Sequence, residues 1–325
     1  MLSYYEIMQK FDLLVVGAGP AGLTAAQYGA RAGLRVLVPE ADAVGGQALF
    51  IDNLENYPGN VAGKSGGGIT VDMHKQAMDF GAEFIGAQVL SISQNEGTSF
   101  WTALLSDGMS IQIRAVILAS GARNKTLDIP GEAEFAGSGV SYCAVCDGPF
   151  FKGKKIFVVG GGDAACDEAR FLGRLSQNIN LIHRRDKLRA QKSIANRVYK
   201  DPAINVRLCL RILEIKGGKK VESVVLENTN SGEKMEEAAD AVFVFTGITP
   251  QNELALGSGL KDAVKLDKGG FIITNQGMAT SVPGLFAAGD VRSTPFRQVV
   301  VACGEGAIAA HSAAEYIQTL GDQCG

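Results

Sequence analysis

Two cysteines stand at a spacing suited to reversible redox chemistry. Cys143 and Cys146 lie in the segment SYCAVCDG at 141–148. A C-x-x-C spacing closes a small ring and suits a disulfide that opens and re-forms. The same spacing suits half of a zinc site, but zinc requires two more Cys or His ligands. The other cysteines are isolated along the chain and the three histidines form no ligand pair, so we expect no metal.

A carboxylic acid follows the pair directly, at Asp147. Such a group can move protons during thiol–disulfide exchange. Asp147 can also cap a turn together with Gly148, and the two roles are compatible. The pair and its acid therefore indicate a site for electron and proton transfer.

A nucleotide-binding pattern precedes this pair. Leu13 to Val16 is a short apolar run typical of a buried parallel strand. It leads into GAGPAG at 17–22, an Ala-rich stretch to about Ala32, and a second apolar run from Arg35 to Val38 that ends at Glu40. Strand, Gly-rich turn, helix, strand and acid, in that order, form the dinucleotide fingerprint in its required context.

The pattern occurs a second time after the cysteine pair. Ile156 to Val159 leads into GGGDAA at 160–165, a helical stretch to about Leu175, and a strand from Asn178 to Ile182. Counted from the first glycine of each turn, the position of Glu40 is held in this second unit by His183.

The two strand ends favour different nucleotides. The residue at this position meets the adenosine ribose. A carboxylate such as Glu40 accepts hydrogen bonds from ribose hydroxyls and repels a 2′-phosphate, so the first unit suits FAD or NAD. His183 is followed by Arg184 and Arg185, and guanidinium groups pair with phosphate. The second unit therefore suits NADP(H), although a basic run can also be a solvated surface.

Two further apolar strands end abruptly at glycine, and a third ends in Gly-Asp. They span 115–121 (AVILASG), 241–247 (AVFVFTG) and 284–290 (GLFAAGD). In a protein with two dinucleotides such strands return the chain beside the bound cofactors. Asp290, at the end of the third strand, could bond a ribityl hydroxyl. The alternative is that all three are ordinary buried strands.

Length and composition fit this organisation. The chain has 325 residues and a formal net charge of -3. That length suits two domains, and the charge gives no general case for binding nucleic acid or an anionic membrane. Neither a secretory signal nor a run of roughly 18 apolar residues is visible. We expect a cytoplasmic protein, in which a disulfide is usually catalytic or redox-sensing.

The chain resembles the low-molecular-weight NADPH-dependent thioredoxin reductases of the pyridine nucleotide-disulfide oxidoreductase superfamily. The CxxCD motif between two dinucleotide units and HRRDxxRA are specific to that family. Glutathione reductase-type enzymes instead place CxxxxC just after the first unit and add a C-terminal interface domain. The matching motifs are GAGPAG (17–22), GGQ (45–47), ENYPG (55–59), CAVCDG (143–148), GGGDAA (160–165), HRRDKLRA (183–190), GLFAAGDV (284–291) and RQVV (297–300).

The resemblance implies an α/β fold with two Rossmann-like (three-layer) dinucleotide-binding domains. The FAD domain is discontinuous, at 1–124 and 251–325, and the inserted NADPH domain at 125–250 carries the CxxC. Electrons would pass from NADPH to FAD, to the Cys143–Cys146 disulfide, and to the disulfide of thioredoxin or another thioredoxin-fold protein. A homodimer, and rotation of one domain against the other, are further implications.

The resemblance also assigns residues. Cys146 would face the flavin, Cys143 would be the interchange thiol, and Asp147 the general acid. The FAD contacts would be Gly17, Gly19, Pro20, Ala21, Gly22, Glu40, Gly45, Gly46, Gln47, Asn56, Gly121, Asp290, Arg297, Gln298 and Val299. The NADPH contacts would be Gly160, Gly162, Asp163, Ala164 and Ala165, with His183, Arg184, Arg185 and Arg189 at the 2′-phosphate.

Two features depart from the family pattern. KSGGG at 64–68 replaces a segment that opens a helix with bulkier residues in relatives, so we expect that helix to start late. Cys324 stands alone in the tail, whereas a catalytic tail needs two adjacent redox residues, so a frayed terminus is expected. Cys166, Cys209 and Cys303 are expected to be small core residues.

Two other functions remain open. A flavin-dependent dithiol oxidase of related fold would pass electrons to oxygen and would not need the HRR cluster. A non-catalytic flavoprotein that senses redox state would keep the flavin fingerprint and turn over no disulfide. An NADPH oxidation assay with disulfide substrates separates all three.

Overall fold

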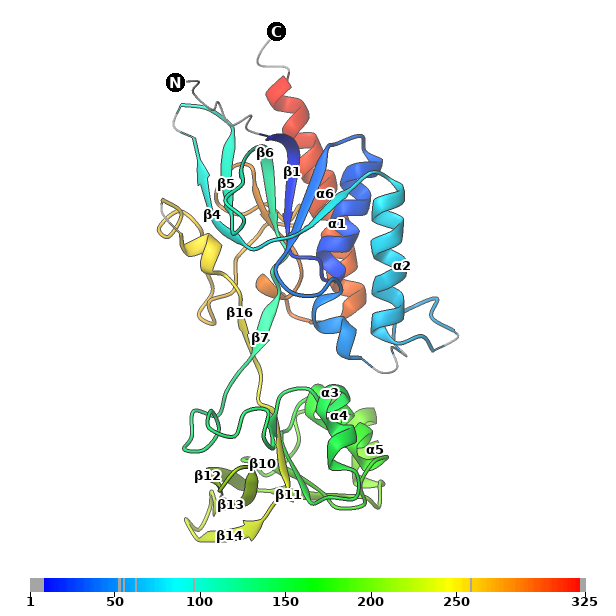
Figure 1. The fold of residues 1–325 in the computed structure, drawn as a ribbon, viewed down its shortest axis with the longest axis vertical. Helices are drawn as coiled ribbons and strands as arrows, with labels where there is room; N and C mark the ends of the chain where they lie inside the picture. Colours follow the sequence, from blue (N-terminus) through cyan, green and yellow to red (C-terminus); the bar gives the residue numbers. More distant parts are fainter. Residues whose placement is uncertain are drawn as a thin grey trace. The chain divides into compact units, whose positions relative to one another are not determined.

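The computed structural model describes residues 9–51, 54, 56–61, 63–95, 97–257 and 259–321, with the backbone alone at Gln9 and Cys146. The chain divides into two compact units (Figure 1). The first unit comprises residues 1–123 and 249–325, and the second unit comprises residues 124–248. Cys324 lies outside the described residues.

The first unit is built on a sheet of seven described strands. Five strands are parallel, in the order β3-β2-β1-β6-β17, and β5 and β4 extend β6 as an antiparallel meander. The strands are β1 (Gln9–Val16), β2 (Val36–Glu40), β3 (Glu83–Gly86), β4 (Val89–Gln94), β5 (Trp101–Leu105), β6 (Ser110–Leu118) and β17 (Leu285–Ala287).

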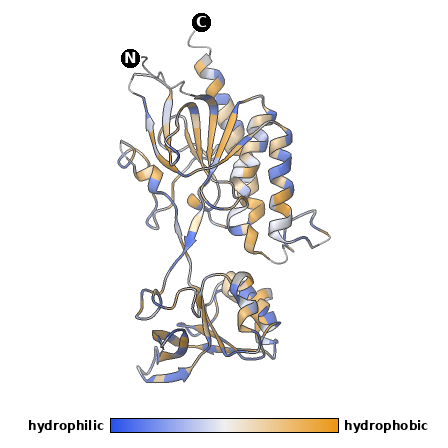
Figure 2. Cartoon of the chain, in the orientation of Figure 1, coloured by the Kyte–Doolittle hydropathy of each residue, from blue (hydrophilic) through white to orange (hydrophobic). Residues whose placement is uncertain are grey.

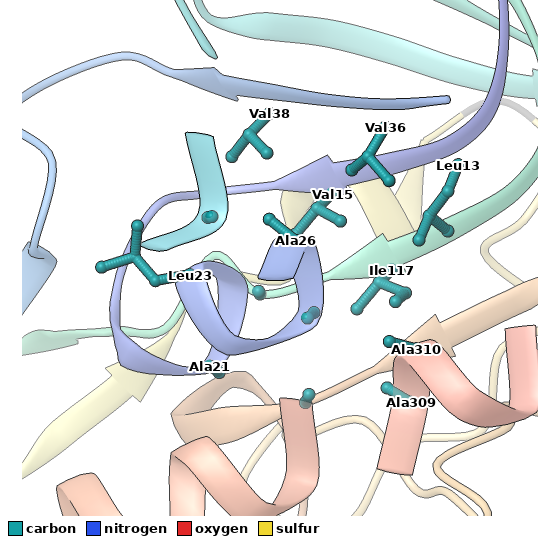
Figure 3. Close-up of a cluster of buried hydrophobic side chains, with 14 of the residues drawn as sticks. Leu13, Val15, Ala21, Leu23, Ala26, Val36, Val38, Ile117, Ala309 and Ala310 are labelled. Carbon is teal, nitrogen blue, oxygen red and sulfur yellow. The ribbon is translucent and has the colours of Figure 1, made fainter. Parts of the chain in front are cut away.

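Three helices of this unit pack side by side (Figure 1). They are α1 (Pro20–Arg31), α2 (Gly66–Asp79) and α6 (Val299–Gly321). Alanines of α1 and α6, among them Ala26 and Ala310, meet branched residues of the strands such as Val15 and Ile117 in one buried cluster (Figure 3). Small side chains let the helices approach closely: a Cβ added at Gly306 would overlap the carbonyl oxygen of Ala21.

The second unit contains a five-stranded parallel sheet in the order β11-β10-β9-β15-β8. Its central strands are almost wholly apolar (Figure 2), as expected of parallel strands buried on both faces. The strands are β8 (Val140–Ser141), β9 (Ile156–Gly160), β10 (Ile179–His183), β11 (Ile204–Leu208) and β15 (Ala241–Phe245), and the helices are α3 (Ala144–Asp147), α4 (Asp163–Gly173) and α5 (Lys192–Tyr199).

A separate antiparallel sheet of the second unit consists of β12 (Leu210–Gly217), β13 (Val221–Asn228) and β14 (Lys234–Ala238). The two passages of the chain between the units pair as β7 (Ala122–Asn124) and β16 (Ile248–Pro250). Four short 3-10 turns complete the described elements: η1 (Gly46–Phe50), η2 (Gly148–Phe151), η3 (Glu253–Leu256) and η4 (Gly289–Val291).

The expectation of a late start for the helix after KSGGG is wrong. Helix α2 begins at Gly66, inside that segment, because Ser65 caps it: its Oγ accepts a hydrogen bond from Gly68 N–H at 3.1 Å. Gly66 also has a packing reason, since an added Cβ would overlap the carbonyl oxygen of Ala48.

Two of the three cysteines expected in the core are buried, and the third is not. Cys166 and Cys303 are buried. Cys209 is not a core residue: it is half-buried between β11 and β12 and has a φ of +54°. None of the described helices combines the length and the apolar character that crossing a membrane requires.

Candidate nucleotide and disulfide sites

The first glycine turn joins β1 to α1, and its three glycines face different surroundings. Gly17 has a φ of +99°, and an added Cβ would lie 2.7 Å from the carbonyl oxygen of Ala119. A Cβ at Gly22 would overlap the carbonyl oxygen of Gly17, so this glycine lets α1 pack on the turn. A Cβ at Gly19 would meet no atom within 4 Å. The N-terminus of α1 therefore has one open face, where a phosphate could approach the backbone.

Glu40 ends β2 beside this turn. Its Oε2 accepts a hydrogen bond from Ala18 N–H at 2.7 Å, and its Oε1 accepts one from Asp42 N–H at 3.0 Å. Pro20 occupies the first position of α1, where its missing N–H leaves no bond unmade, and Ala21 follows it, buried. The carboxylate is thus held at the turn, with acceptor capacity left for a ribose.

The GGQ segment lies on the same turn. Gly45 N–H donates to Ala18 O at 2.8 Å, and a Cβ at Gly46 would lie 3.2 Å from Gly19 Cα. Gln47 Nε2 donates to Ala122 O at 3.0 Å. Gly121, with a φ of +71°, lies between the end of β6 and the start of β7 at Ala122. The predicted flavin contacts at 45–47 are therefore gathered beside the first glycine turn.

The C-terminal strand brings further predicted contacts. Asp290 lies in η4 directly after β17. Burial raises the pKa of the Asp290 carboxyl, the Arg297 charge lowers it, and the Glu305 charge raises it. The guanidinium of Arg297 lies 4.1 Å from the centroid of the Phe271 ring.

Asn56 and Gln298 are more than two hundred positions apart but meet in the structure. Asn56 Nδ2 donates to Gln298 Oε1 at 2.7 Å. Val299, the next residue, begins α6. The structure thus joins the predicted contacts from ENYPG and RQVV within the first unit.

The second glycine turn repeats the arrangement of the first. A Cβ at Gly160 would overlap the carbonyl oxygen of Phe245, whereas a Cβ at Gly162 would meet no atom within 4 Å. Gly162 is the N-cap of α4. Ala165 is buried and faces Gly160, while Ala164 is exposed at the start of the helix. The open face again lies at a helix N-terminus.

His183 ends β10 beside this turn and is 6% exposed. Burial lowers the pKa of its imidazole, and the charges of Arg189, Arg185 and Arg184 lower it further. All three arginines are exposed, and none forms an ion pair among the described residues. The end of β10 therefore carries three arginines that form no ion pair within the described part of the chain, whereas the end of β2 carries a carboxylate.

Asp163 is predicted as a nucleotide contact, but both of its carboxylate oxygens already accept hydrogen bonds within the protein. Oδ1 accepts from Gln191 N–H at 2.7 Å and Oδ2 accepts from Gln191 Nε2 at 2.6 Å. Asp163 therefore ties the first residue of α4 to the loop that carries Arg189.

The cysteine pair lies at α3 of the second unit. Cys143 is disulfide-bonded and half-buried. Its N–H donates to Ser141 Oγ at 3.0 Å, and its carbonyl accepts from Asp147 N–H at 3.2 Å. Asp147 is half-buried at the end of the turn. The side chain of Cys146 lies outside the described atoms, so its pairing with Cys143 stays a prediction.

A buried acid near the pair was missed by sequence reasoning. Glu132 is 3% exposed and accepts from Leu127 N–H, Asp128 N–H and Tyr142 Oη at 2.7–2.8 Å. Burial and this bond raise the pKa of Tyr142 above its usual value. Glu132 thus fixes the residue before Cys143. A single acid in a loop carries no periodic signal that could have revealed it.

A second missed acid, Glu305, supports the segment around Asp290. It accepts from Gly289 N–H at 2.8 Å and forms a buried ion pair with Arg292. Here a signal existed, because Glu305 is the one charged residue in the otherwise apolar stretch 299–310. A lone charge on such a helix indicates a buried, paired group.

The family model described as pyridine nucleotide-disulphide oxidoreductase matches residues 11–306. A thioredoxin reductase of Treponema pallidum is 50% identical over 317 residues, covering 95% of this chain and 98% of the relative. One of Peptoclostridium acidaminophilum is 40% identical over 314 residues, covering 95% and 97%.

Solved structures of thioredoxin reductases have the same fold as this chain. The Lactococcus lactis thioredoxin reductase (FR conformation) superposes with a TM-score of 0.89 at 39% identity, covering 95% of this chain and 99% of that one. The T. acidophilum thioredoxin reductase gives a TM-score of 0.87 at 33% identity, covering 94% and 98%. The predicted family and the predicted α/β fold class are confirmed. The chain belongs to the pyridine nucleotide-disulphide oxidoreductase family, and within it to the thioredoxin reductases, which are flavoprotein disulfide reductases.

Proposed function

We propose that this protein reduces the disulfide of thioredoxin, with NADPH as the electron donor and FAD as its flavin. The main support is the contrast between the two strand ends. Glu40 presents a carboxylate to the first open helix N-terminus. Near the second, His183 lies among the charges of Arg184, Arg185 and Arg189, which form no ion pair with any described residue. One unit then suits a plain ribose and the other a 2′-phosphate.

The first unit fits FAD. The open face at Gly19, the anchored Glu40, and the half-buried carboxyl of Asp290 would hold the pyrophosphate, ribose and ribityl groups respectively. The predicted isoalloxazine contacts are Gly45, Gly46, Gln47, Asn56, Arg297, Gln298 and Val299. We assign this role to residues 1–124 and 251–325.

The second unit fits NADPH. The open face at Gly162 would hold the pyrophosphate, and Arg184, Arg185 and Arg189 would hold the 2′-phosphate. We assign this role to residues 125–250. When both cofactors are bound, they would supply a hydride from the nicotinamide and an electron pair for a disulfide.

The cysteines would carry that pair to the substrate. Cys146 is the thiol that faces the flavin, and Cys143, as thiolate, attacks one sulfur of the thioredoxin disulfide. A mixed disulfide forms and one substrate thiolate leaves, which Asp147 protonates. Cys146 then attacks Cys143, which releases the second substrate thiol and restores the Cys143–Cys146 disulfide. Two electrons pass to the substrate and the enzyme dithiol is oxidised.

The test is steady-state NADPH oxidation with a panel of thioredoxin-fold disulfides, with NADH as the control donor. We expect turnover with a thioredoxin and a strong preference for NADPH. Rapid NADPH oxidation with oxygen and none with disulfides would instead indicate an oxidase. A cytoplasmic homodimer is also part of the proposal, and sedimentation of the purified protein would test the dimer.

A further inference from the structure

The loop that carries the arginines runs from Arg184 to Gln191, between β10 and α5. It contains neither helix nor strand. Ordering a loop of this kind on ligand binding loses conformational entropy and weakens binding, unless the backbone is already held in place. Its backbone hydrogen bonds therefore decide how well its arginines are placed.

The beginning of the loop is anchored by residues next to the antiparallel sheet. Thr229 Oγ1 donates to Arg184 O at 3.1 Å. Cys209 N–H donates to Arg185 O at 3.0 Å, and Thr229 N–H donates to Cys209 O at 2.8 Å. Cys209 has a φ of +54°, in the left-handed region that a cysteine seldom adopts. The strained residue belongs to the chain of bonds that holds the two arginine carbonyls.

The end of the loop is anchored on the glycine turn. Arg189 N–H and Ala190 N–H both donate to Gly161 O, at 2.6 and 3.0 Å. Gln191 then binds both oxygens of Asp163, through its backbone N–H and its side-chain amide. Hydrogen bonds to a charged group are stronger than neutral ones. This end of the loop is therefore fixed to the first residue of α4.

We propose that Thr229 and Gln191 are positioning residues for the 2′-phosphate of the nucleotide. Neither needs to touch the ligand: each holds one end of the 184–191 backbone so that the arginines converge without first ordering the loop. The inference rests on the proposed function, because it takes the arginine cluster as the 2′-phosphate site. It predicts that substitutions of these two residues weaken the binding of nucleotides that carry the 2′-phosphate and do not change the binding of nucleotides that lack it.

The test uses the flavin-loaded enzyme and two probes, adenosine 2′,5′-bisphosphate and adenosine 5′-monophosphate, titrated by calorimetry. The variants are Thr229→Val, Gln191→Met and their combination. Thr229→Ser keeps the hydroxyl and should restore binding. Ser223→Ala is the matched control, because it removes a hydroxyl that donates to Glu236 within the same antiparallel sheet rather than to the loop.

Each single variant should weaken binding of the bisphosphate about 3- to 10-fold, the usual effect of one lost hydrogen bond. The combination should weaken it more, and binding of the monophosphate should stay within about twofold. In steady-state assays the KM for NADPH should rise, while kcat and the KM for NADH stay unchanged.

Two results would overturn the inference. Unchanged bisphosphate binding in the combined variant would show that the bonds are irrelevant, and an equal loss for both probes would show a merely structural role. The variant Arg184→Ala/Arg185→Ala separates this failure from failure of the proposed function. If that variant keeps the preference for the bisphosphate, the assignment of the NADPH site itself is wrong.

Discussion

Glu40 Oε2 accepts a hydrogen bond from Ala18 N–H at 2.7 Å, which ties the end of β2 to the middle of the first glycine turn. The residue that would recognise the ribose and the turn that would carry the pyrophosphate are thus one rigid unit. In the second unit the equivalent residues, Gly161 and His183, are packed closely together, because a Cβ added at Gly161 would overlap the imidazole ring.

Glu40→Gln should weaken FAD binding. The amide keeps the size of the side chain but loses the charge and one acceptor, and a hydrogen bond to a charged group contributes about 1.5–3 kcal/mol. We expect a loss of roughly tenfold or more in affinity, measured by flavin fluorescence on the apoprotein. Unchanged affinity would mean that Glu40 only stabilises the glycine turn and does not contact FAD.

Gly19→Ala and Gly22→Ala should separate ligand binding from folding. At Gly22 the added Cβ overlaps the backbone of Gly17, so the apoprotein should lose roughly 1–3 kcal/mol of unfolding free energy. At Gly19 the added methyl group meets open space, so stability should hold while FAD uptake falls. Denaturant unfolding and flavin content measure the two effects, and equal stability losses would contradict the assignment of Gly19 to the ligand.

Asp290→Asn should stabilise the apoprotein and weaken FAD binding. Burial raises the pKa of the Asp290 carboxyl, so the folded state holds its proton more tightly than the unfolded state. Stability is therefore lost as the pH rises through the interval between the ordinary and the raised pKa, and the charged form is a cost at neutral pH. We expect a Tm gain of a few degrees at pH 8 that shrinks toward acidic pH. A variant less stable at pH 8 would contradict this.

Arg184→Ala/Arg185→Ala should change nucleotide preference. Each charge-assisted contact to phosphate contributes about 1.5–3 kcal/mol, so the loss of both should raise the KM for NADPH about 10²-fold or more and leave NADH nearly unaffected. Arg211→Ala is the control, because this exposed arginine of the same unit pairs with Glu227 instead. An unchanged NADPH-to-NADH preference would place the phosphate elsewhere.

The local patterns predicted much of this architecture. Strand, glycine turn and helix occur where the sequence indicates them in both units, because apolar runs and glycine spacing are local signals. A late start was wrongly expected for α2, which begins at Gly66, because a serine cap and a close approach to Ala48 outweigh the poor helix propensity of three glycines.

The supporting contacts were not predictable in the same way. Glu132, Gln191 and Thr229 reach partners that depend on how loops return in three dimensions. Cys209 adopts a left-handed backbone conformation that the neighbouring residues in the sequence do not indicate. Such loop residues follow neither the helical nor the strand periodicity of the sequence, so their contacts can be identified only in the folded structure.

The unequal roles of the two cysteines are the central claim, and Cys146→Ser tests it most directly. Rapid mixing with NADPH should still bleach the flavin absorbance in this variant, because hydride transfer does not involve the thiols, while turnover with thioredoxin vanishes. Cys143→Ser should form a mixed disulfide less readily, and Asp147→Asn should slow turnover about 10²–10⁴-fold while keeping the disulfide. Cys209→Ser changes a free half-buried cysteine of the same unit and keeps the backbone bonds of that residue to Arg185 and Thr229, so it should keep full turnover. If Cys146→Ser retained wild-type turnover with thioredoxin, the cysteine pair would not be the path of the electrons, and the proposed mechanism would be wrong.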